Sequence, residues 1–257
     1  MKRVLLILMA ALAVGAPPKQ VPRQIKVPLW VEGGQTTPLT AKDFSARLQN
    51  TSARVTGVEG PDDDLIVLAV LDLTGDIAYV APAKDAFVAA LGKLPSHTWV
   101  GLMRAQDGLR VLVDPTPDRQ KIAEAVNNMN VSGKAGVLDT VEIAEKIADS
   151  MLAKAAVRVA VFYLTDSDVH NYREDFTNPV INSSDSHDLS RRFPEVLVQE
   201  KISKLQAALA GRQAPLFIVH LRYFTDRLNE AYQNGLKQLA EVTGGTAAFC
   251  RSEGGTA

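Results

Sequence analysis

The sequence predicts an α/β fold: a doubly wound, mostly parallel sheet flanked by helices, with a small β appendage before it. Three long apolar runs, at 65–71, 157–164 and 215–221, are typical of strands that are buried on both faces of a parallel sheet. Segments with helical periodicity separate these runs. Such alternation of strands and helices indicates right-handed crossovers within one sheet.

Composition limits the classes of protein that this chain can belong to. The 257 residues are 46% hydrophobic, which is enough for one large α/β domain and a small appendage. The formal net charge is −1, so we expect no nucleic-acid partner. Cys250 is the single cysteine, which excludes an internal disulfide.

The first residues predict export. Residues 1–16, MKRVLLILMAALAVGA, combine a basic start, a short apolar core and small residues, the pattern of a secretory signal peptide. Cleavage after Ala13 or Ala16 fits the pattern, and the apolar core is too short for a stable membrane span. We therefore expect a protein of the periplasm, the cell envelope or the medium, with no transmembrane span after signal removal.

Residues 17–60 are predicted to form a linker and a small β region. Residues 17–23 are rich in proline and lack periodicity, as in an extended linker. Three short strands are expected within IKVPLWVEGG, DFSARLQN and ARVTGVEG, because apolar and polar residues alternate between turn signals. The main domain is expected to occupy 61–257.

Within the main domain, the pattern after the first buried strand predicts a helix over 82–94 and then a hairpin. The hairpin turns at Gln106-Asp107-Gly108, where the Asp-Gly pair favours a tight turn. Thr116 is a plausible N-cap of the next helix, with Pro117 at its first position.

The second half of the domain continues the alternation. A helix over 136–155 places an apolar stripe on one face, and two later helices are expected at 194–211 and 229–244. A terminal edge strand follows. The polar stretch 167–192 is longer than most α/β connections, and we expect it to be the least ordered interior segment.

Acidic and hydroxyl side chains follow two of the buried strands. Asp72, Thr74 and Asp76 end the run LIVLAVLDLTGD, and Asp166 ends VAVFYLTD. Ligands of open α/β sheets bind beyond the carboxyl ends of the strands, so these oxygens lie at the expected place for a site. An ordinary strand-ending turn would use the same residue types. His220 lies inside an apolar strand and is expected to be a satisfied buried histidine.

Five segments carry a resemblance to a known family. They are VLAVLDLTGD, WVGLMRAQDGLRVLVDPTPDR, SGKAGVLDTVEIA, VAVFYLTDSD and LKQLAEVTGGTAAF. From Asp64 to Arg251 the chain resembles a von Willebrand factor type A domain, whose fold is Rossmann-like. The phrase of Leu39, Thr40, Asp43 and Phe44 before it resembles the N-terminal region of exported bacterial VWFA-related proteins, which are common in acidobacteria.

The resemblance implies a metal-ion-dependent adhesion site, which binds Mg²⁺ or Ca²⁺ through hydroxyl and carboxylate oxygens. Asp72, Thr74, Asp76 and Asp166 fall on four of its positions. Asp76 stands where the family has a hydroxyl, and Ala135 stands where it has a threonine. The site is therefore a degenerate one, with one oxygen lost and one neutral ligand replaced by a charge. Three converging carboxylates would largely neutralise the ion.

The resemblance implies an exported, non-catalytic domain for adhesion or scaffolding that binds another protein or an envelope macromolecule. Two alternatives stay open. One is a Mg²⁺-dependent hydrolase of doubly wound fold with Asp72 as nucleophile, although Thr74 stands where such an enzyme needs a second carboxylate. The other is a structural envelope component whose metal site is dead.

Overall fold

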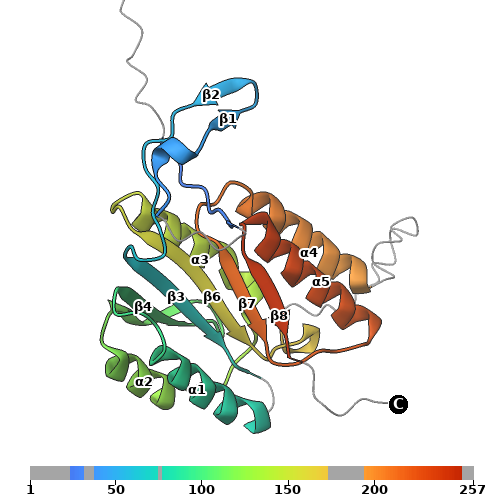
Figure 1. The fold of residues 1–257 in the computed structure, drawn as a ribbon. Helices are drawn as coiled ribbons and strands as arrows, with labels where there is room; N and C mark the ends of the chain where they lie inside the picture. Colours follow the sequence, from blue (N-terminus) through green and yellow to red (C-terminus); the bar gives the residue numbers. More distant parts are fainter. Residues whose placement is uncertain (1–23, 32–37, 75–76, 173–193, 251–257) are drawn as a thin grey trace, which may run out of the picture.

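A six-stranded sheet forms the centre of the molecule (Figure 1). The computed structural model describes residues 24–31, 38–74, 77–172 and 194–250. The strands lie in the order β5-β4-β3-β6-β7-β8. Their bounds are β3 Leu65–Asp72, β4 Thr98–Arg104, β5 Arg110–Thr116, β6 Arg158–Thr165, β7 Leu216–His220 and β8 Thr246–Phe249.

The predicted sheet is confirmed. The three apolar runs form β3, β6 and β7, which are neighbours in the middle of the sheet. Strands β4, β3, β6, β7 and β8 are parallel, and only the edge strand β5 runs antiparallel to its neighbour. The β4–β5 hairpin turns through Asp107 and Gly108, whose φ angles of 55° and 113° are those that an Asp-Gly turn supplies.

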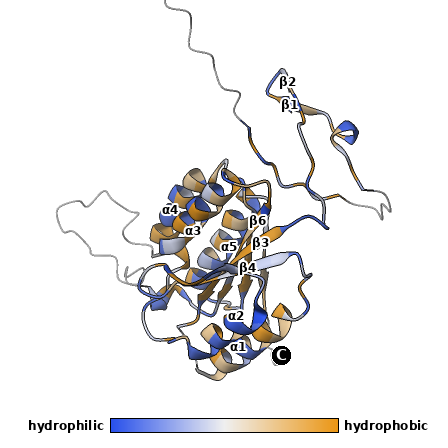
Figure 2. Ribbon diagram, turned by 90° about the vertical axis from the view of Figure 1, so that its left-hand side faces the viewer, coloured by the Kyte–Doolittle hydropathy of each residue, from blue (hydrophilic) through white to orange (hydrophobic). Residues whose placement is uncertain are grey.

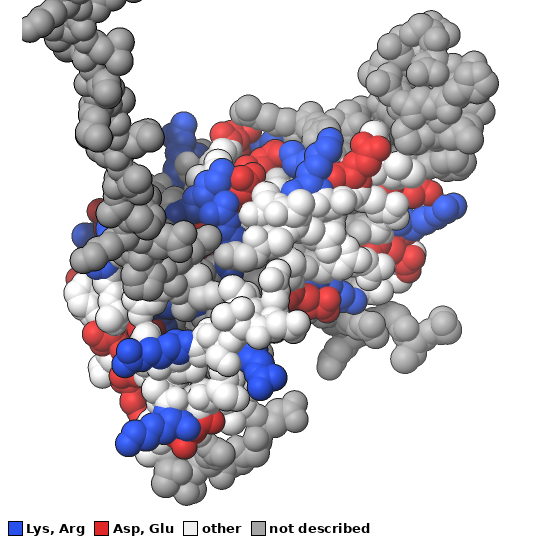
Figure 3. Space-filling view, turned by 90° about the horizontal axis from the view of Figure 1, so that it is seen from above, with Lys and Arg blue, Asp and Glu red and all other residues white. Residues whose placement is uncertain are grey.

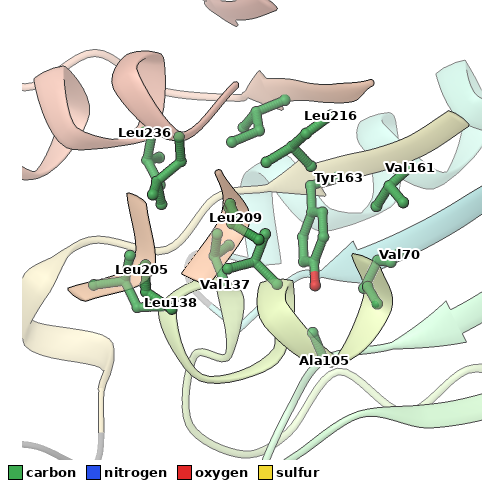
Figure 4. Close-up of a cluster of buried hydrophobic side chains, with 14 of the residues drawn as sticks. Val70, Ala105, Val137, Leu138, Val161, Tyr163, Leu205, Leu209, Leu216 and Leu236 are labelled. Carbon is green, nitrogen blue, oxygen red and sulfur yellow. The ribbon is translucent and has the colours of Figure 1, made fainter. Parts of the chain in front are cut away.

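Helices cover both faces of the sheet (Figures 1 and 2). Helices α1 (Ile77–Leu91) and α2 (Arg119–Asn128) pack on one face, and their apolar residues form a cluster with β3 and β4. Helices α3 (Val137–Leu152), α4 (Pro194–Leu209) and α5 (Arg227–Val242) pack on the other. Figure 4 shows this second cluster, in which Tyr163 of β6 lies among aliphatic side chains of β3 and the three helices.

Three helix starts differ from the prediction by more than one residue, and α5 begins at Arg227 instead of 229. Helix α1 begins at Ile77, so Pro82 lies inside it, whereas we expected a start at the proline. The extra turn buries Val80 on the same face as Phe87 and Leu91, and this burial offsets the hydrogen bond that a proline removes. The N-cap of α2 is Asp118, whose carboxylate accepts from the backbone N–H of Lys121 at 3.0 Å. The Thr116 prediction was wrong because that residue still pairs within β5.

The N-terminal region contains two strands within its described residues, not the predicted three. Strands β1 (Ala46–Leu48) and β2 (Thr51–Ala53) form an antiparallel hairpin in which every residue is exposed, after a 3-10 turn at Ala41–Asp43. The IKVPLWV part of the first predicted strand, at 25–31, is extended and pairs with no strand. That part is held by side-chain contacts instead of a ladder.

Those contacts join the segment 24–31 to the amino ends of the central strands. Lys26 Nζ donates to the carbonyl of Val157 at 2.8 Å, and its backbone N–H donates to Gln213 Oε1 at 2.7 Å. The Trp30 indole donates to Gly244 O at 2.9 Å and meets the Phe217 ring edge-on. The segment thus crosses the sheet at the end opposite the carboxyl edge.

Some predictions lie outside the described residues: the signal peptide at 1–16, Asp76, and the part of the polar stretch that begins at 173. None of the helices in the described ranges has the length and apolarity that a membrane span requires. On the face seen in Figure 3, lysine and arginine side chains are interspersed with aspartate and glutamate side chains.

Candidate functional site

The carboxyl ends of β3 and β6 bring three of the four predicted ligands together. Asp72 lies opposite Thr165 in the parallel register, so the residues that follow each strand are neighbours. The backbone N–H of Thr74 donates to Asp166 Oδ1 at 2.8 Å. The backbone N–H of Asp166 donates to the carbonyl of Asp72 at 3.3 Å.

The Asp72 carboxylate is buried and accepts three hydrogen bonds. Its Oδ1 accepts from the backbone N–H of Gly136 at 3.1 Å. Its Oδ2 accepts from the hydroxyls of Thr165 at 3.1 Å and Ser167 at 2.9 Å. A carboxylate has about four lone-pair positions, so most of its accepting capacity is used within the protein.

Burial raises the pKa of Asp72 to about 7, and the nearby charge of Asp166 pushes in the same direction. The three hydrogen bonds favour the charged form but offset only part of the desolvation. Asp72 therefore changes charge near neutral pH, and a cation at this place competes with a proton for its oxygen.

The loop before α3 approaches the end of β4 very closely. Gly136 is the N-cap of α3, and a Cβ built on it would lie 1.6 Å from the carbonyl oxygen of Ala105. Glycine is needed there because no side chain fits between the two backbones. Ala135 is buried beside it, and its side chain is a methyl group without an oxygen.

Two buried polar residues at this edge were missed by sequence reasoning. The sequence pattern places Ser167 only in the polar stretch and Gln106 only in the hairpin turn. Gln106 Nε2 donates to the carbonyl of Leu73 at 2.9 Å. Each lies two positions past the carboxyl end of a parallel strand, Ser167 after β6 and Gln106 after β4, and this position is the signal that points to them.

The prediction for His220 is confirmed. The ring is fully buried, Nε2 contacts the carbonyl of Ser167 at 2.7 Å, and Nδ1 accepts from the backbone N–H of Arg222 at 3.2 Å. Burial lowers its pKa. The neutral ring with a proton on Nε2 satisfies both contacts and fixes the backbone that carries Ser167.

Two buried oxygens at this edge have no hydrogen-bond partner among the described residues: Thr74 Oγ1 and Gln106 Oε1. The side chains of Asp72 and Asp166 at the same edge also offer oxygens only, the ligand type that suits Mg²⁺ or Ca²⁺. Within the described ranges no three His, Cys, Asp or Glu side chains group around one point. The residue types therefore fit a hard cation whose coordination shell combines these carboxylates with neutral oxygens such as Thr74 Oγ1 and Gln106 Oε1.

The part of the chain that contains this candidate site is similar to a known protein family. Residues 69–168 match the family model of the von Willebrand factor type A domain. The matched stretch begins inside β3 and contains Asp72, Thr74, Ala135 and Asp166. The predicted resemblance to a type A domain is thereby confirmed for these residues.

Solved structures similar to this chain include two that carry the von Willebrand factor name. One, from Catenulispora acidiphila, is 14% identical over 74% of this chain and 39% of its own, with a TM-score of 0.49. The von Willebrand factor domain of a type V pilus tip protein from Porphyromonas gingivalis is 14% identical over 74% of this chain and 90% of its own, with a TM-score of 0.47. BatB from Bacteroides thetaiotaomicron is 12% identical over 73% and 90%, with a TM-score of 0.46. No curated protein matches the chain.

Proposed function

We propose that this protein is an exported, non-catalytic binding domain that serves in adhesion or as a scaffold, and that its carboxyl edge binds Mg²⁺ or Ca²⁺. The observation that carries the cation is the buried hydroxyl of Thr74, which has no partner among the described residues and follows Asp72 by two positions. The type A match of residues 69–168 supports a role in binding another protein or an envelope macromolecule.

Asp72, Thr74 and Asp166 would hold the ion, with Asp76 as the fourth predicted ligand. A bound cation supplies a positive centre that accepts an oxygen from a partner. Three carboxylates would leave that centre nearly neutral, so it would attract a partner's carboxylate only weakly. The partner would then have to bind through a wider area of the surface.

The buried position of Asp72 argues against the hydrolase alternative. A nucleophilic carboxylate must reach the substrate, whereas Asp72 is fully buried and its three hydrogen bonds leave about one lone-pair position, which a small ion could use. The same hydrogen bonds favour the structural alternative, in which the Thr165 and Ser167 hydroxyls stabilise Asp72 in place of an ion.

Thermal unfolding of the chain with EDTA, Mg²⁺ or Ca²⁺ separates these candidates. An ion that binds only the folded state at a hundredfold over its dissociation constant adds about 2.7 kcal/mol. For a domain of this size, we expect the melting temperature to rise by about 5–10 °C. Asp72→Asn and Asp166→Asn should each abolish the rise, while Asp114→Asn on the exposed side of β5 should retain it. No rise in the wild-type protein would favour the structural candidate.

The affinity for the ion should depend on pH. Because Asp72 has a pKa of about 7, it is largely protonated at pH 6 and largely charged at pH 8. We expect the dissociation constant for Ca²⁺ to fall by about tenfold between these values, as the ion no longer displaces a proton. Calorimetric titration in two buffers of different ionisation enthalpy would measure the released proton. An affinity that is flat across this range would contradict this prediction.

The partner requires its own experiment. Envelope extracts passed over the immobilised 61–257 region, with EDTA and Ca²⁺ in parallel, would identify what binds and whether binding needs the ion. Turnover of phosphoester or peptide substrates in the presence of Mg²⁺ would instead support the hydrolase.

A further inference from the structure

The side chain of Gln106 has a fixed orientation and one unused oxygen. The residue is fully buried, and its Nε2 donates to the carbonyl of Leu73 at 2.9 Å. The amide cannot be turned around, because a carbonyl oxygen requires a donor opposite it. Gln106 Oε1 is consequently an acceptor that is buried and finds no donor among the described residues.

Backbone contacts place Gln106 between the two loops of the candidate site. On one side, the N–H of Ala105 donates to the carbonyl of Leu71 at 3.1 Å, which aligns the end of β4 with the start of the Asp72 loop. On the other side, the N–H of Asp107 donates to the carbonyl of Lys134 at 3.2 Å, beside Ala135. Gln106 therefore lies on the side of the site where Ala135 provides no oxygen.

We propose that Gln106 is a metal ligand of this chain, and that its amide oxygen replaces the hydroxyl that Ala135 lacks. This inference rests on the proposed cation site. Amide carbonyl oxygens are ordinary ligands of Ca²⁺, which takes six to eight oxygens in flexible geometry. A neutral ligand also suits a site that already has several carboxylates, because it completes the shell without adding charge.

The ligand role explains why a buried acceptor without a donor persists. An unsatisfied buried oxygen destabilises the ion-free folded state. Coordination of an ion would supply the partner that this oxygen lacks. Thr74 Oγ1, the other such oxygen at this edge of the sheet, is one residue beyond the carbonyl that Gln106 contacts. An ion bound near the Leu73–Thr74 peptide would use both oxygens at once.

The test is calorimetric titration of the full chain with Ca²⁺. Gln106→Met keeps the length of the side chain and removes its oxygen, and we expect affinity to fall by at least about tenfold, the loss typical for groups that support a metal site. Gln106→Met combined with Ala135→Ser should recover most of that loss, because the new hydroxyl lies on the same side. Gln120→Met on the exposed surface of α2 is the matched control and should bind as the wild type does.

Melting in EDTA separates the ligand role from a structural one. Gln106→Met should melt lower in EDTA because Leu73 loses its donor, and should also gain less on addition of Ca²⁺. Gln106→Glu should melt lower in EDTA through carboxylate repulsion, and should gain more than the wild type with Ca²⁺. If Gln106→Met does not fold, the gain in melting temperature of Gln106→Glu with Ca²⁺ still tests the ligand role.

The outcomes distinguish this inference from the function on which it rests. If the wild type binds Ca²⁺, Asp72→Asn abolishes binding and Gln106→Met binds normally, the cation site stands and the role of Gln106 is rejected. If the wild type neither binds Ca²⁺ nor melts higher with it, both proposals are rejected.

Discussion

Replacing Asp72 by alanine should lower the free energy of unfolding by about 3 kcal/mol or more, even with no ion present. The substitution leaves the backbone N–H of Gly136 buried without an acceptor, and the hydroxyls of Thr165 and Ser167 lose theirs. Asparagine at the same position should lower it by only about 1 kcal/mol. Its carbonyl oxygen can accept from Gly136, and the two hydroxyl oxygens can accept from its amide.

Urea denaturation of both variants in EDTA at pH 7 would measure the difference. Asp114→Ala removes an exposed carboxylate from β5 and should change stability little. Equal losses for alanine and asparagine would mean that the charge of Asp72, not its hydrogen bonds, stabilises this edge of the sheet.

Replacing Glu145 by methionine should stabilise the protein at alkaline pH. Glu145 lies on the buried face of α3, it is fully buried, and neither of its carboxylate oxygens has a partner among the described residues. Burial raises its pKa to about 8; Asp149 adds to the shift and Arg212 opposes it. Because the folded pKa lies above the unfolded one, the folded state holds this proton more tightly.

The sign of the pH dependence follows from that shift. The stabilisation from the protonated Glu145 is complete below the ordinary carboxyl pKa and is lost as pH rises through about 8. At about 1.4 kcal/mol per pKa unit, the loss is on the order of 3–5 kcal/mol for the wild type. Glu145→Met removes this loss, so its advantage should be small at pH 5 and largest near pH 9.

Chemical denaturation at several pH values in EDTA would test this result. Asp72 contributes a slope of the same sign, so the informative quantity is the difference between wild type and variant at each pH. Glu142→Met, on the exposed side of the same helix and paired with Lys146, is the matched control and should not flatten the curve. Parallel curves for wild type and Glu145→Met would contradict the prediction.

The sequence predicts an element well when the hydrophobic pattern of that one segment is enough to determine which of its residues are buried. The run Leu65–Leu71 must lie in a covered sheet because both faces are apolar, and it does. The hydrophobic pattern is insufficient where contacts with neighbouring segments determine the residue at which an element begins or ends. Helix α1 starts before Pro82 because Val80 finds a place in the core, and Thr116 stays in β5 because Val100 pairs with it.

The residues of the candidate site also differ in how well the sequence predicts them. Asp72, Thr74 and Asp166 could be predicted because each follows a strand that is evident in the sequence. Gln106 and Ser167 also follow parallel strands, but a glutamine or serine in a polar loop does not show that its side chain is buried, so their position alone was the signal. Glu145 was missed for a related reason: the α3 stripe predicts which face is buried but not that a carboxylate is included in it.

The position of segment 24–31 has a mechanical consequence. Lys26 and Trp30 anchor this segment at the amino ends of the central strands, whereas Asp72 and Asp166 lie at the carboxyl ends, about 25 Å away along an eight-residue strand. A load applied between segment 24–31 and the carboxyl edge would run parallel to β3 and β6. The ladder of hydrogen bonds between these strands would then be sheared together instead of being peeled apart one by one, and this direction of pull is the one in which a parallel sheet resists extension best.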